Sequence, residues 1–331
     1  MLRHSCRLFL MTAVERTAAP TPRVSDATST YNTEESGDSS NSGVGGPRGF
    51  LFALRSLVAW NNTNAAAAAA SAPLSSSSTV SSTHNSSSTS GAALDVVEAV
   101  VRDRWTCRQF DTSRSIDLDT LKRVLAATTR APTGFNLQGW HAVVVTDTAV
   151  REQLFKAALG QPQVLQAPVT IVFLGDREPE RYAPQALEMG LETGYYHPLY
   201  GAAYLRNVYY FMHGGPTQSM AAVKSFVSAW YSRASGTPLV SVPVSRTGYA
   251  WKQAMIPATT FVQLCTAAGW NTCMMEGIDE EAVKLALGVP GERYSVPVVI
   301  SVGFATTAEA AKREIRCPRF ATSHTVRWNK F

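Results

Sequence analysis

The composition changes abruptly near residue 93, and this change limits which part of the chain can build a core. Residues 61–92 contain no Asp, Glu, Lys or Arg and include an unbroken run from Ala65 to Ala70, followed by a Ser/Thr-rich tract. Such a segment carries too little large apolar surface to offset the entropy lost on ordering it. We therefore predict a disordered, low-complexity linker at 61–92 and a folded domain at 93–331.

Residues 1–60 have the features of a targeting sequence. The segment Met1–Val14 holds Arg3 and Arg7 among apolar side chains and has no acidic residue. An acid-free, arginine-bearing, amphipathic N-terminus predicts a mitochondrial presequence. The alternative is a merely disordered tail on a cytoplasmic protein. A second basic and apolar patch at Arg48–Trp60 fits either an extension of the presequence or contact with a membrane surface.

Overall composition excludes several classes of protein. The 331 residues are 45% hydrophobic, which suffices for a sizeable core, yet no apolar run is long enough for a transmembrane helix. The net charge is +5, and scattered rather than clustered basic residues argue against nucleic acid as a partner. The five cysteines are widely spaced without a C-x-x-C pair, so we expect no disulfide framework, no zinc site and a reducing compartment.

Hydrophobic spacing predicts alternating helices and strands after residue 93. Helices are expected at Leu94–Asp103, from an Asp117 cap to Arg130, and at Thr148–Leu159, Ser219–Ser232, Ile256–Ala268 and Glu280–Leu287. Strands are expected at Ala142–Thr146, Val169–Leu174 and Pro297–Val302. The helix at 219–232 places its large apolar residues along one stripe, namely Met220, Val223, Phe226, Val227 and Trp230. Four or five strands with helices on both sides indicate an α+β or α/β layered fold.

The common catalytic motifs are missing from the sequence. It contains no P-loop, no G-x-S-x-G, no H-E-x-x-H and no strand followed by G-x-G-x-x-G. Two arginine pairs remain: Arg104 and Arg108 flank Thr106, and Arg316 and Arg319 lie near the C-terminus. Planar guanidinium groups beside a hydroxyl suit a phosphate, because each can donate two hydrogen bonds to adjacent oxygens. Exposed charged pairs usually only face water, so both interpretations stay open.

The residues around the first arginine pair form a longer motif. Arg104–Phe110 resembles the R-x-[ST]-x-R-x-F opening of the FMN-dependent nitroreductase family. Further matches to that family follow in its order: A-P-S-x-x-N-x-Q-P-W at Ala131–Trp140, Q-x-x-V-x-x-A-P at Gln161–Pro168, G-x-x-x-x-x-M-E-G-F-D at Gly269–Asp279, and L-G-I-P at Leu287–Pro290. Together they span nearly all of residues 94–331. Two departures are Trp105, where a second basic residue or histidine is usual, and Gly139, where proline is usual.

The resemblance implies an α+β fold: a nitroreductase-like three-layer sandwich with a central, mostly antiparallel sheet flanked by helices. It also implies an intertwined homodimer with two FMN sites at its interface. The FMN phosphate and the near side of the ring would be held by Arg104, Trp105, Thr106 and Arg108. Arg316 and Arg319 would complete the phosphate cage, although their spacing also allows Lys312 or Arg313 to replace one of them.

The resemblance assigns the remaining cofactor contacts to three other segments. The flavin would be lined from the other subunit by Pro132, Thr133, Gly134 and Asn136. Gln161, or alternatively Gln163, would hydrogen-bond the pyrimidine edge. The backbone at Glu276 and Gly277 would approach N5 and O4 of the ring. The tyrosine-rich span 176–248 is expected to include the lid that selects the substrate.

The implied activity is an FMN-dependent NAD(P)H oxidoreductase. NADH or NADPH would deliver hydride to flavin N5, and a quinone or nitroaromatic would then take two electrons in the same pocket. No side chain needs a catalytic role and no metal is expected, because the flavin carries the chemistry. Together with the presequence, the domain is similar to the mitochondrial type I nitroreductases of trypanosomatids.

Two alternatives to this activity stay open. One is an FMN-binding interaction protein without turnover, and the other is a different activity of the same fold, such as dehalogenation. Cys107, between the two arginines, is either a thiol whose pKa they lower or a small buried residue.

Overall fold

The computed structural model describes residues 87–331 except 216–218 and 316. The predicted presequence at 1–60 and the first part of the predicted linker, 61–86, lie outside the described residues. Helix α3 (Ser87–Asp103) begins before Leu94, the start expected from the apolar pattern, and so takes in the end of the segment assigned to the linker.

A four-stranded antiparallel sheet forms the centre of the domain. The strands are β1 (Trp140–Val145), β2 (Val169–Asp176), β3 (Asn271–Met275) and β4 (Tyr294–Gly303), in the order β1-β2-β4-β3. Every residue of β2 is buried, as is nearly all of β4. Runs of valine and isoleucine suit these two interior strands, since β-branched side chains pack well on a pleated surface that is covered on both faces.

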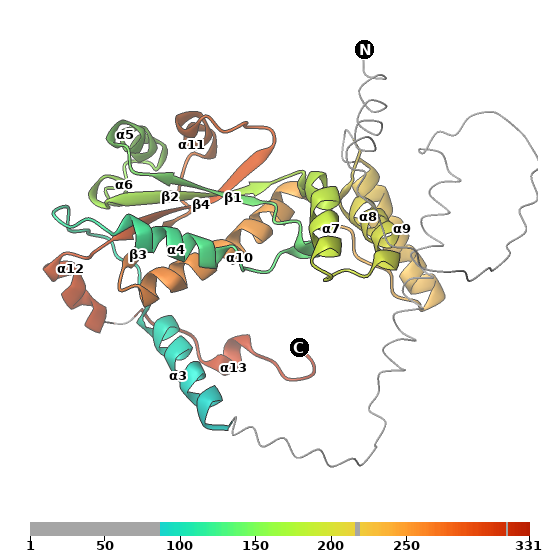
Figure 1. The fold of residues 1–331 in the computed structure, drawn as a ribbon, viewed down its shortest axis with the longest axis horizontal. Helices are drawn as coiled ribbons and strands as arrows, with labels where there is room; N and C mark the ends of the chain where they lie inside the picture. Colours follow the sequence, from blue (N-terminus) through green and yellow to red (C-terminus); the bar gives the residue numbers. More distant parts are fainter. Residues whose placement is uncertain (1–86, 216–218, 316) are drawn as a thin grey trace, which may run out of the picture. The chain divides into compact units, whose positions relative to one another are not determined.

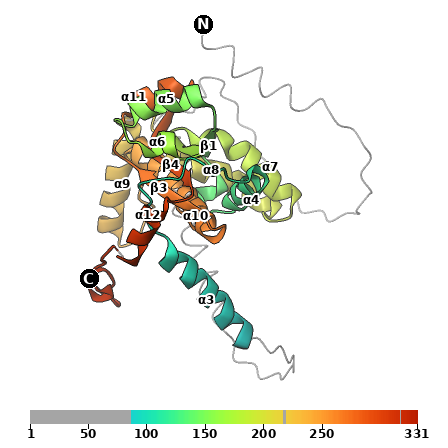
Figure 2. The same cartoon turned by 90° about the vertical axis from the view of Figure 1, so that its left-hand side faces the viewer.

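Successive side chains of β2 and β4 pack into two separate cores, one on each face of the sheet. Val172, Leu174 and Val299 face a core built with α5 (Thr148–Ala157), α6 (Gln163–Gln166) and α11 (Glu280–Leu287). Ile171, Phe173 and Ile300 face the opposite core, built with α4 (Leu118–Thr128) and α10 (Arg246–Ala267). Figures 1 and 2 show these two helical layers around the sheet. The predicted three-layer α+β sandwich is therefore confirmed.

Helix boundaries follow the capping residues closely. Asp117 Oδ2 accepts a hydrogen bond of 2.8 Å from Thr120 N at the start of α4, and Gly288 ends α11 with a φ of 64°.

Helix α10 begins at Arg246, earlier than the expected Ile256, because Ser245 caps it by accepting a hydrogen bond of 3.0 Å from Gly248 N. It accommodates Pro257 inside the helix, where the buried proline packs among residues that cover the sheet. Packing here outweighs the preference of proline for the start of a helix.

A helical insert occupies residues 177–245, between β2 and α10. It comprises η2 (Pro179–Tyr182), α7 (Ala183–Glu192), η3 (Pro198–Tyr200), α8 (Gly201–Met212) and α9 (Ser219–Ser235). In α9 the apolar stripe faces outward, with Phe226 72% and Trp230 61% exposed. The inner face holds Lys224, whose Nζ donates to the carbonyl oxygens of Tyr210 and His213 at 3.0 and 2.6 Å. These contacts satisfy carbonyls at the end of α8, which is why the polar face of α9 turns inward.

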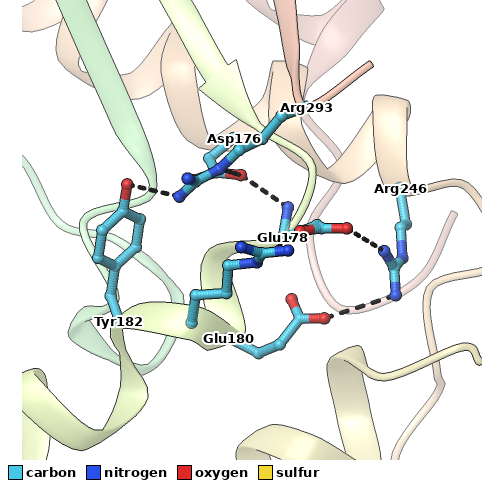
Figure 3. A network of polar contacts seen from close by, with 7 residues as sticks. Asp176, Glu178, Glu180, Tyr182, Arg246 and Arg293 are labelled. Atoms are coloured by element: carbon cyan, nitrogen blue, oxygen red, sulfur yellow. Dashed lines mark hydrogen bonds and ion pairs between the residues drawn. The ribbon is translucent and has the colours of Figure 1, made fainter. Parts of the chain in front are cut away.

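Ion pairs tie the start of this insert to α10 and to the residue before β4 (Figure 3). Asp176, the last residue of β2, is fully buried, and its Oδ2 lies 2.7 Å from Nη2 of Arg293. Arg246, the first residue of α10, lies 3.6 Å from Glu178 and 3.5 Å from Glu180. The segment that leaves the sheet and the helix that returns to it are thus held together by charge.

Short helical segments complete the domain. They are η1 (Gly134–Asn136) between α4 and β1, and, after β4, α12 (Thr307–Ala311), η4 (Lys312–Glu314) and α13 (Thr322–Thr325). Across the ranges that the structure describes, no helix is both long and apolar enough to cross a bilayer.

We predict that Arg293→Met lowers the free energy of unfolding by about 3–5 kcal/mol, because the Asp176 carboxylate stays buried without its partner. The matched control is Lys122→Met, which removes an exposed ion pair with Asp119 and should cost less than about 1 kcal/mol. Chemical denaturation of both variants measures the difference. Equal losses in the free energy of unfolding would show that the buried ion pair stabilises the fold no more than the exposed one does.

Candidate functional site

A pocket of about 640 Å³ lies between the end of α3 and the chain that follows β4. Its lining includes Arg104, Trp105, Thr106, Arg108 and Arg319, five of the residues predicted from sequence to bind the cofactor. The predicted partner Arg316 lies outside the described residues. Residues near the start of the domain (101–108) and near its end (309–319) therefore line one pocket, where the sequence predicts the phosphate of the cofactor.

The first arginine motif is fixed to the edge of the sheet. Thr106 pairs with Thr272 of β3 in a parallel bridge, and Cys107 N donates to Thr272 O at 3.0 Å. The Cys107 side chain is fully buried, and this burial raises the pKa of its thiol to about 12. Cys107 is therefore a neutral packing residue rather than a reactive thiol, and it anchors the backbone between Arg104 and Arg108.

A buried carboxylate that the sequence analysis missed supports this motif. Glu309 Oε1 accepts a hydrogen bond of 2.8 Å from the backbone N of Arg108, and its Oε2 lies 2.8 Å from Nζ of Lys312. Burial by itself raises the pKa of Glu309, but the hydrogen bonds from Lys312 and Arg108 outweigh it and lower the pKa. Glu309 N also donates to Oγ1 of Thr306, so a T-x-x-E capping motif could have revealed this residue.

The pocket lining is strongly basic. It includes two carboxylates, Asp103 and Glu309, and six basic side chains: Arg102, Arg104, Arg108, Lys312, Arg313 and Arg319. Asp103 is paired with Arg313 at 3.1 Å, and Arg102 is paired with Glu98 outside the lining. The surplus of guanidinium groups gives the donor chemistry that a phosphate dianion requires. Lys312 and Arg313, the alternative C-terminal cations, also line the pocket, where they are paired with Glu309 and Asp103.

A second group of predicted residues lies at the other end of β3. Gln161 Nε2 donates to Gly277 O at 2.9 Å, and Glu276 and Gly277 directly follow the strand. A Cβ added at Gly277 would meet no atom within 4 Å, so a ligand could approach this backbone closely. Gln163, the alternative to Gln161, is buried, and its Oε1 has no hydrogen-bond partner in the described part of the chain.

Strand β3 connects the pocket to the Gln161–Gly277 contact. Thr272 touches the arginine motif, and Met275 precedes Glu276. The three steps between them correspond to roughly 10 Å at the usual rise of a strand. The structure thus places a cationic end and an amide end along one edge of the sheet.

The third group, Pro132, Thr133, Gly134 and Asn136, does not line the pocket. It belongs to the loop between α4 and β1, where Gly134 N donates to Oε1 of Gln253 at 2.7 Å. The resemblance assigns this group to the partner subunit's site, so its separation from the pocket within one chain is the expected arrangement. Among the residues that the structure describes, no three His, Cys, Asp or Glu side chains gather as metal ligands would.

The model of a family described as the nitroreductase family matches residues 101–304. MhqN of Bacillus subtilis (strain 168), provisionally named an NAD(P)H nitroreductase, is 26% identical over 219 residues, covering 66% of this chain and 93% of MhqN. The NADH dehydrogenase of Thermus thermophilus is 28% identical over 185 residues, covering 56% of this chain and 75% of that protein.

Solved structures agree with the fold. A crystal structure of the Bacillus subtilis protein ydfN, provisionally called a nitroreductase, superposes with a TM-score of 0.54 at 24% identity, covering 71% of this chain and 99% of ydfN. A protein from Exiguobacterium sibiricum, solved in complex with FMN, gives a TM-score of 0.51 at 18% identity, covering 70% and 97%. At these identities the likeness shows the fold alone. Because the family model spans more than half of the sequence, the chain belongs to the nitroreductase family.

Proposed function

We propose that this protein is an FMN-dependent NAD(P)H oxidoreductase that reduces quinones and nitroaromatics. The observation that carries the proposal is the cation-lined pocket at one end of β3, with the Gln161–Gly277 contact at the other. The names of the relatives support a nicotinamide reductant, and the FMN in the Exiguobacterium structure supports the choice of flavin. We further propose that residues 1–60 direct the full chain to the mitochondrion.

The phosphate would be held by Arg104, Arg108 and Arg319, with the hydroxyl of Thr106 as a further donor. Arg316 would complete this cage, while Trp105 would cover the near side of the ring. The bent backbone around Arg108 is fixed by Glu309, which sets the point from which this arginine would reach a phosphate.

At the other end of β3, the side-chain amide of Gln161 would bind the pyrimidine edge. The backbone at Glu276 and Gly277 would approach N5 and O4, as the open space at Gly277 allows. When bound, FMN would supply the redox chemistry: hydride transfer from NADH or NADPH through N5 and two-electron reduction of the acceptor in a ping-pong cycle. The chain's contribution is then to bind, to orient and to supply hydrogen bonds.

A homodimer is part of the proposal, because α3 and α9 expose apolar side chains among the residues that the structure describes. Leu94, Val96 and Val97 of α3 are exposed, and so are Phe226 and Trp230 of α9. Large exposed apolar side chains gathered on one element are typical of protein interfaces. Dimerisation would also bring the loop containing Asn136 to the partner's site.

We expect the purified full chain to be yellow and to lose its visible flavin absorbance when NADH or NADPH is added without oxygen. Reoxidation by a quinone or a nitroaromatic should then restore the colour. A yellow protein that neither nucleotide bleaches would favour an FMN-binding interaction protein without turnover. A protein that takes up no FMN would contradict the whole proposal.

We expect Arg108→Ala to raise the Kd for FMN about 10- to 150-fold, because one charge-assisted hydrogen bond contributes roughly 1.5–3 kcal/mol. Arg123→Ala, an exposed arginine of α4 outside the pocket, is the control and should leave the Kd unchanged. Titration of the apoproteins with FMN measures both values. An unchanged Kd for the Arg108 variant would show that Arg108 does not bind the phosphate, and would contradict the assignment of the phosphate to this pocket.

A further inference from the structure

The loop between α4 and β1 has an unusual backbone. Phe135, Asn136 and Gln138 have φ angles of 55°, 54° and 50°, in the left-handed region that non-glycine residues rarely adopt. Several such residues in a short segment persist only where the surroundings hold them, and they occur preferentially at functional sites. The question is which side chains hold this loop in place.

Two side chains from different elements bind the loop backbone. Gln253 of α10 accepts the hydrogen bond from Gly134 N at 2.7 Å. Tyr204 of α8 donates its hydroxyl to Phe135 O, also at 2.7 Å. Next to these contacts, a Cβ at Gly134 would lie 2.3 Å from the hydroxyl oxygen of Tyr249, so a side chain fits there only if Tyr249 moves.

Tyr204 is firmly fixed in the helical insert. Its side chain is 1% exposed, and its ring contacts the rings of Phe135, Tyr196 and Tyr200 at centroid distances of 6.5, 5.2 and 5.9 Å. Burial raises the pKa of the Tyr204 hydroxyl, which therefore remains a hydrogen-bond donor at physiological pH. The insert thus reaches the loop through one directed bond in addition to aromatic packing.

We propose that Tyr204 is a positioning residue, which acts with Gln253 to hold the left-handed loop so that Asn136 is presented to the flavin. The proposal rests on the proposed function, since it assumes that Asn136 lines the FMN site. It also links the helical insert to the loop that contains Asn136, through the Tyr204–Phe135 hydrogen bond.

The first test compares Tyr204→Phe with Tyr200→Phe in the full-length protein. Both variants keep the aromatic ring, but only the first loses a hydrogen bond to the loop. We expect Tyr204→Phe to raise the Kd for FMN about tenfold, since it leaves a part-buried carbonyl unpaired, and Tyr200→Phe to change it by less than about twofold. The absorption maximum and the midpoint potential of the bound flavin should shift only in the Tyr204 variant, and a loss of stability alone would not produce such shifts.

The second test uses the close contact at Gly134. Gly134→Ala should weaken FMN binding by about tenfold or more, because the new Cβ collides with the Tyr249 hydroxyl. Adding Tyr249→Phe removes that oxygen and leaves the nearest atoms at 3.5 and 3.6 Å, which is ordinary contact. The double variant should therefore recover binding to within about threefold of Tyr249→Phe alone.

The outcomes separate this inference from the proposed function. If the unaltered protein binds FMN but Tyr204→Phe and Tyr200→Phe behave alike, the positioning role is wrong and the proposed function stands. Failure of Tyr249→Phe to rescue Gly134→Ala would likewise overturn it. If the unaltered protein binds no FMN, the proposed function and this inference both fail.

Discussion

The antiparallel pairing of β2 with β4 is the constraint on which the rest of the structure depends. Both strands are almost entirely buried, so each face of the sheet must be covered by apolar helices. Helices α5, α6 and α11 cover one face, and α4 and α10 cover the other. With the faces occupied, the edges formed by β1 and β3 are left for other contacts. The cationic pocket and the Gln161–Gly277 contact lie along the edge formed by β3.

The sequence predicts the regular core well, because its signals there are local. The Asp117 cap, the glycine after Leu287 and the β-branched runs of β2 and β4 each specify an element without distant information. The start of α10 was missed, because the prediction followed the apolar run from Ile256 and passed over Ser245, whose side chain caps the helix. The orientation of α9 was equally hidden: its apolar stripe suggests a buried face, but the carbonyls at the end of α8 draw Lys224 inward.

In the candidate site, too, some residues could be predicted from the sequence and others could not. Arg104, Thr106, Arg108 and Arg319 were found from motifs, and the structure gathers them around one pocket. Glu309 and Tyr204 were not found, because each acts on the backbone of a distant residue. The T-x-x-E spacing marks Glu309 as a capping residue, but its contact with Arg108, like that of Tyr204 with Phe135, depends on the fold. These contacts nevertheless hold the backbone beside Arg108 and Asn136, on which precise cofactor binding would depend.

The affinity for FMN relative to riboflavin tests whether the cationic pocket holds the phosphate of a flavin. Riboflavin has the same ring system and lacks only the phosphate, so calorimetric titration of the apoprotein with both ligands isolates that group. Two charge-assisted contacts predict that FMN binds about 100-fold more tightly or better. Equal affinities would contradict the account, because the arginines of the pocket would then have no role in holding the cofactor.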